Sequence, residues 1–140
     1  MNRTSSTFTA QDALLAIMVA VSASDENMKT AELVAIERIV NHFPAFADFD
    51  TDRIEWISRT VLDLLEDPEG LQALFGLVRD ALPARLYETA YAMACDIAAA
   101  DGRLDQDELS ILLEVRHELD IDRLAAAALE RGARARHMTL

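Results

Sequence analysis

Apolar residues recur along this chain at the three- and four-residue spacing of amphipathic helices. Pro44 and Pro83 interrupt the pattern, because proline cannot continue a helix and restricts the residue before it. The acidic stretch after Ser24 and the Asp101-Gly102 pair break it again. The remaining segments predict about seven helices, at residues 9–23, 30–41, 51–66, 68–82, 84–99, from 105 onward, and 122–131.

Capping residues fix several of these boundaries. Thr9 with Asp12 three residues later forms a capping-box pattern at the first helix. Asp67 followed by Pro68 indicates the start of the fourth helix, with aspartate as the N-cap and proline in the first turn. Gly132 indicates the end of the seventh helix, so we expect residues 132–140 to form a basic, frayed tail.

The chain contains an internal repeat at an offset of 76 residues. Each copy is a helix, a turn that opens with aspartate, an apolar residue three positions later, a glutamate seven positions later, and a second helix. The offset aligns Ala23 with Ala99, Asp25 with Asp101, Glu32 with Glu108, and Leu33 with Leu109. We therefore predict an all-α fold in which two pseudo-symmetric repeats, about 10–43 and 84–119, form one compact bundle and one domain spanning 1–140.

The two turns contain half of a calcium-binding pattern. Asp101-Gly102 followed by Leu104 and Glu108 reproduces the second half of an EF-hand loop, which ends on a bidentate glutamate. The first half is missing from both copies, and neither turn alone supplies the six to eight oxygens that calcium takes.

The four turn carboxylates therefore allow two interpretations. If the repeats pack about a pseudo-two-fold axis, Asp25, Glu32, Asp101 and Glu108 converge and hold a divalent metal ion. Alternatively, the aspartates end one helix and the glutamates cap the next, as Glu108 would do with Asp105 as the N-cap.

Charge and composition exclude several classes of protein. The formal net charge of −12 repels nucleic acid and anionic lipid, and favours a metal ion or a basic partner. The apolar run from Ala13 to Val21 is too short to span a bilayer. Cys95 lies in an alanine-rich stretch without a neighbouring histidine, so we expect a buried, inert thiol. No nucleophile or phosphate-binding loop accompanies the carboxylates, so we expect no enzymatic activity.

The second turn, AAADGRL followed by DEL, resembles the signature of the tellurite-resistance TerB family, and SASDENM followed by EL resembles its first copy. The resemblance extends over about residues 10–129. It implies a fold of about seven helices, a role in resistance to tellurite and other stresses at the cytoplasmic side of a membrane-associated assembly, and divalent metal bound by Asp25, Glu32, Asp101 and Glu108. Glu26 stands where the second copy has Gly102, which is a departure from the family pattern.

These observations predict a non-enzymatic, cytoplasmic stress-response module that binds a divalent metal ion through its acidic turns. We expect its partners to be other stress-response proteins, with no nucleic acid and no direct membrane insertion. The alternative is a protein–protein interaction scaffold, or a co-chaperone-type domain, whose acidic turns are only helix caps.

Overall fold

The computed structural model describes residues 8–24, 30–100, 102 and 106–140. These residues form seven α-helices and two short 3-10 helices, and they contain no strand. The helices are α1 (Ala10–Ala23), α2 (Thr30–His42), η2 (Pro44–Phe46), α3 (Arg53–Leu65), α4 (Gly70–Ala81), η3 (Ala84–Leu86), α5 (Tyr87–Ala99), α6 (Gln106–Glu118) and α7 (Arg123–Arg136). The predicted all-α fold class is therefore confirmed.

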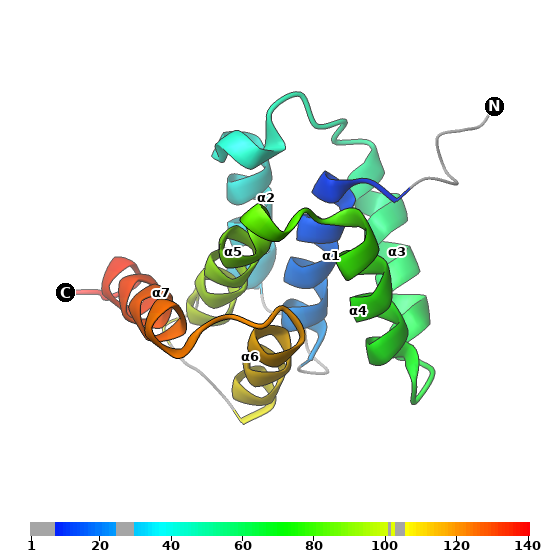
Figure 1. Ribbon diagram of the computed structural model, residues 1–140. Coiled ribbons are helices and arrows are strands. Elements are labelled where there is room, and N and C mark those ends of the chain that lie inside the picture. Colours follow the sequence, from blue (N-terminus) through cyan, green and yellow to red (C-terminus); the bar gives the residue numbers. More distant parts are fainter. Residues whose placement is uncertain (1–7, 25–29, 101, 103–105) are drawn as a thin grey trace.

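Helices α1 and α5 pack against each other at the centre of the bundle. Both run down the view in Figure 1, and α2 and α6 return upward. Helix α2 contacts α1 and α5, and α6 contacts the same two helices. Helices α3 and α4 cover the free side of α1, and α7 covers the free side of α5. Each repeat thus places its second helix against the central helices of both repeats.

The central helices are apolar around most of their circumference because neighbours surround them. Every residue of α1 from Asp12 to Ser22 is buried. In α5, Ala90, Ala94 and Ala98 are buried, and these small side chains let the flanking helices approach closely. The alanine-rich segment thus forms one central helix, and α1 forms the other.

The outer helices bury only one stripe each, as amphipathic helices do. Helix α3 buries Ile57 and Val61, and α4 buries Leu74, Phe75 and Val78. Phe46 from the 3-10 turn after α2 enters the core and meets Phe49 edge-on at a ring-centroid distance of 5.3 Å.

The burial pattern reproduces the sequence repeat position by position. Residues 30–39 and residues 106–115, which the offset of 76 aligns, alternate between buried and exposed positions in the same order. The likeness extends beyond the predicted repeat units, because α3 packs on α1 in the way that α7 packs on α5. Each repeat is therefore a three-helix unit, and α4 joins the two units.

The predicted capping box of α1 is confirmed, and α7 has an aspartate cap that was not predicted. The Thr9 hydroxyl accepts a hydrogen bond from the Asp12 amide, and the Asp12 carboxylate accepts one from the Thr9 amide, which completes a capping box. The Asp122 carboxylate accepts hydrogen bonds from the amides of Leu124 and Ala125.

Several predicted helix boundaries are wrong. Helix α3 begins at Arg53 instead of 51, and α5 begins at Tyr87, after a 3-10 turn, instead of 84. Helix α4 begins at Gly70, and the Asp67 carboxylate accepts a hydrogen bond from the Glu69 amide in a turn before the helix. Helix α7 continues through Gly132 to Arg136 instead of ending at 131. A helical glycine costs only about 1 kcal/mol relative to alanine, and Arg136 gains an ion pair with Asp96 on α5 at 2.6 Å.

Candidate functional site

Glu32 and Glu108 occupy equivalent places in the two repeats. Each lies in the first turn of the helix that follows an acidic turn, α2 for Glu32 and α6 for Glu108. Both side chains are fully buried. Because α2 packs on α5 and α6 packs on α1, each glutamate lies on a helix that contacts the central helix of the other repeat.

A carboxylate out of reach of water is costly unless donors or cations compensate it. Glu32 accepts a hydrogen bond from the Ser22 hydroxyl at 3.1 Å, which links α2 to the end of α1. Ala98, which has no hydroxyl, stands at the matching position of the second repeat. The two glutamates are therefore equally buried and occupy equivalent positions in the repeats, but only Glu32 has a serine hydroxyl at this place.

The predicted ligands Asp25 and Asp101 lie outside the described residues. Within the described ranges, no group of three or more histidine, cysteine or acidic side chains is arranged to hold a metal ion. Gly102 is described, and it has a φ of 79°, the left-handed conformation that favours glycine. Its amide donates a hydrogen bond to the Ala99 carbonyl at 2.9 Å, so the backbone at Gly102 has a conformation that favours glycine.

Cys95 and His42 each lie in surroundings that give the side chain a role within the fold. Cys95 is 3% exposed, and burial raises the pKa of its thiol to about 12. The Nδ1 atom of His42 lies 2.9 Å from the Arg38 carbonyl oxygen, one turn back in its own helix. The prediction that Cys95 is buried is confirmed.

Two polar pairs link helices that are distant in sequence. Asp12 is fully buried and accepts hydrogen bonds from Arg53 Nε at 2.9 Å and Arg53 Nη2 at 2.5 Å, joining α1 to α3. The Tyr91 hydroxyl donates to Glu130 at 2.5 Å, joining α5 to α7. Burial and this hydrogen bond raise the pKa of Tyr91. Sequence spacing carried no signal for either pair, because the partners are 41 and 39 residues apart.

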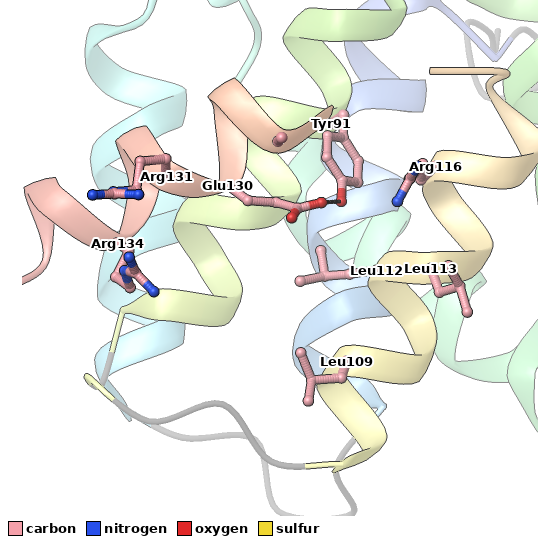
Figure 2. A pocket seen from close by; sticks show the side chains of 9 residues that line it. Tyr91, Leu109, Leu112, Leu113, Arg116, Glu130, Arg131 and Arg134 are labelled. Carbon is pink, nitrogen blue, oxygen red and sulfur yellow. Dashed lines mark hydrogen bonds between the residues drawn. The ribbon is translucent and has the colours of Figure 1, made fainter. Parts of the chain in front are cut away.

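A pocket of about 410 Å³ lies between α6 and α7, with α5 at its base. We name this pocket the α6–α7 groove. In Figure 2, Leu109 and Leu112 project from α6, and Glu130 projects from α7 toward Tyr91. The lining residues are Tyr91, Leu109, Leu112, Leu113, Arg116, Ala127, Glu130, Arg131 and Arg134.

Across the described part of the chain, no helix is both long and apolar enough to cross a membrane.

Comparison with known proteins places the chain in one family. A family model described as tellurite resistance protein TerB matches residues 11–131. No curated protein and no solved structure matches significantly. The match covers both repeats and all of α4, in agreement with the resemblance drawn from the two turns, and this chain therefore belongs to the TerB family.

Proposed function

We propose that this TerB-family domain is a non-enzymatic stress-response module that binds a divalent metal ion through its two acidic turns. The observation that supports the proposal most strongly is the complete burial of Glu32 and Glu108 at equivalent positions beside those turns. A purely capping glutamate in the first turn of a helix has no need to leave solvent, whereas a ligand carboxylate is typically enclosed by the site that it serves.

The donor chemistry fits a hard cation. Glu32 and Glu108 would hold the ion together with Asp25 and Asp101, so that every side-chain donor is a carboxylate oxygen. Calcium, magnesium and manganese prefer such oxygen ligands, and zinc prefers nitrogen and sulfur in structural sites. When bound, the ion would neutralise carboxylates in a protein whose formal net charge is −12.

The alternative, a scaffold whose acidic turns are only helix caps, makes a different prediction about stability. A ligand present at about 100 times its dissociation constant adds about 2.7 kcal/mol to the free energy of unfolding. For a domain of this size, that corresponds to a rise in Tm on the order of 8 °C. A scaffold without a metal site would gain no such stability.

Thermal unfolding of chelator-treated protein, with and without calcium, magnesium, manganese and zinc, tests the proposal. The Glu32→Gln, Glu108→Gln variant keeps the side-chain shape and removes two donor carboxylates. Its matched control is Glu37→Gln, Glu114→Gln, at exposed positions of the same two helices. We expect one metal to raise Tm in the native protein and the control variant only. An equal rise in all three proteins, or none in the native protein, would refute the metal site.

A further inference from the structure

The α6–α7 groove combines an apolar surface with an excess of arginine. Leu113 is 62% exposed and Leu109 is 45% exposed, so both leucines present hydrocarbon to solvent. Arg116 stands on the α6 side, and Arg131 and Arg134 stand on the α7 side. Within the described residues, none of these three guanidinium groups forms a salt bridge. The groove is thus a basic, apolar surface on a strongly acidic protein.

The first repeat provides an internal comparison. The equivalent space between α2 and α3 holds two adjoining pockets. One, of about 170 Å³, is lined by Leu33, Ile36, Ile54 and Glu37, and the other, of about 680 Å³, is lined mainly by polar residues around Glu37 and Glu55. Leu33 and Ile36 align with Leu109 and Leu112, but Glu37 stands where the second repeat has Leu113. Among the described residues, no arginine lines either pocket of the first repeat. Since the fold is the same in both halves, packing alone does not require Leu113 or the three arginines of the α6–α7 groove.

The dimensions of the groove suit a helix. Its α6 wall runs from Leu109 to Arg116 and its α7 wall from Ala127 to Arg134. Seven residues of helix span about 10 Å, which is the distance between the first and last anchors of a helix that binds through positions i, i+4 and i+7. Helices α6 and α7 both pack on α5 without an extensive contact with each other, so the walls leave room between them.

We infer that the α6–α7 groove binds an acidic amphipathic helix of a partner protein. Leucine-type anchors of the partner would lie on Leu109, Leu112 and Leu113, and its flanking carboxylates would pair with Arg116, Arg131 and Arg134. Arginine forms planar, two-point hydrogen bonds with carboxylates, which favours an acidic partner over a neutral one. The Tyr91–Glu130 hydrogen bond braces the base of the groove between α5 and α7. This inference does not depend on metal binding at the acidic turns.

The probe is a synthetic helical peptide of about 14 residues, with leucines at positions i, i+4 and i+7 and glutamates beside them. Two control peptides carry lysine in place of glutamate, or alanine in place of leucine. Titration calorimetry with the whole protein should give saturable binding of the acidic peptide. We expect binding of each control peptide to be at least about tenfold weaker. Equal binding of all three peptides, or no binding of the acidic one, would overturn the inference.

Variants locate the binding on the molecule. Leu109→Glu with Leu113→Glu places acidic groups on exposed positions, and we expect it to weaken binding by at least about tenfold while Tm stays close to that of the native protein. Leu33→Glu, at the equivalent position of the first repeat, is the matched control and should leave binding unchanged. Arg131→Gln with Arg134→Gln should weaken binding and reduce its dependence on salt. Equal loss in the Leu33→Glu control would overturn the assignment to this groove.

Vesicles of phosphatidylglycerol test the other acidic surface that arginine and leucine could contact. We expect the protein not to co-sediment with them, because an extended anionic surface faces the acidic parts of the protein as well as the groove, whereas a short peptide contacts the groove alone. Co-sedimentation that the Leu109→Glu, Leu113→Glu variant abolishes, together with absence of peptide binding, would reassign the groove to a lipid surface and contradict the inference.

Discussion

Buried charges mark the positions at which single residues matter most in this fold. Asp12, Glu32 and Glu108 are all fully buried, yet they have different surroundings. Asp12 completes a capping box and meets Arg53, so its charge is compensated by named partners within the fold. Glu32 accepts a hydrogen bond from Ser22, and both Glu32 and Glu108 lie beside acidic turns, where the proposed metal ion would add a cation. We therefore expect Asp12 to serve stability, and under the metal proposal we expect Glu32 and Glu108 to serve binding as well.

Asp12→Ala should destabilise the protein by about 3 kcal/mol, because it removes the side-chain half of the capping box and takes the buried carboxylate away from Arg53. Urea unfolding followed by circular dichroism measures the change. The control is Glu55→Gln, which breaks the exposed i,i+4 pair with Arg59 and should cost less than about 0.5 kcal/mol. Similar losses in the two variants would contradict a special role for the Asp12–Arg53 pair.

Because of Cys95 and Tyr91, the free energy of unfolding should decrease at alkaline pH. The pKa of the Cys95 thiol rises from 9.0 to about 12 on folding, chiefly through burial, and the pKa of Tyr91 is raised above 10.0. Between pH 9 and pH 12, the unfolded chain releases protons that the native protein retains. The free energy of unfolding therefore falls as pH rises through this window, by on the order of 1 kcal/mol per pH unit.

Thermal unfolding from pH 8 to pH 11 measures this loss. The Cys95→Ala, Tyr91→Phe variant lacks both protons, so its Tm should fall less steeply with pH than that of the native protein. Parallel slopes for the two proteins would contradict the assignment to these residues.

The sequence allowed the hydrogen-bond partners of some residues to be predicted, but not those of others. Thr9 and Asp12 were predictable because a capping box is local, with partners three residues apart. Arg53 as the second partner of Asp12 was not, because only the packing of α3 on α1 brings it there. The Tyr91–Glu130 pair was not predictable either, because only the packing of α7 on α5 brings these residues together.

Individual helices owe their boundaries to both local chemistry and packing. The capping box predicted the start of α1 to within one residue, and the pattern of apolar and polar positions did the same for α2 and α7. The start of α4 was misplaced because a close backbone approach, absent from the sequence pattern, delays the helix until Gly70. A β-carbon at Gly70 would lie 1.6 Å from the Leu64 carbonyl oxygen, whereas one at Gly76 in the same helix would meet nothing within 4 Å.

Two alanine substitutions in α4 should consequently act in opposite directions. Gly76→Ala should stabilise the protein by about 0.5–1 kcal/mol, because alanine is the better helix former and the position has room. Gly70→Ala should destabilise it by more than about 1 kcal/mol, because the backbone of the α3–α4 connection has to shift. Chemical denaturation of both variants checks the pair, and stabilisation by Gly70→Ala would contradict the close approach.

Over the whole molecule, the repeat was the most predictable feature. Its offset, deduced from four aligned pairs of residues, anticipated the matching burial of α2 and α6. The central place of α5 followed from its alanine content, and that of α1 was not predicted. The inclusion of α3 and α7 in the repeat could not be predicted, because their sequences do not align at that offset. The α6–α7 groove could not be predicted from the sequence either, because it depends on how α6 and α7 are placed on α5.

The central claim is that the two acidic turns bind a divalent metal ion, and manganese relaxation in solution tests it most directly. Bound manganese broadens the amide signals of nearby residues in a ¹H–¹⁵N spectrum of the chelator-treated protein. We predict selective broadening at the starts of α2 and α6, around Glu32 and Glu108, with α4 unaffected and reversal by excess calcium or magnesium. Broadening spread evenly over the acidic surface, or the same broadening in the Glu32→Gln, Glu108→Gln variant, would contradict the claim.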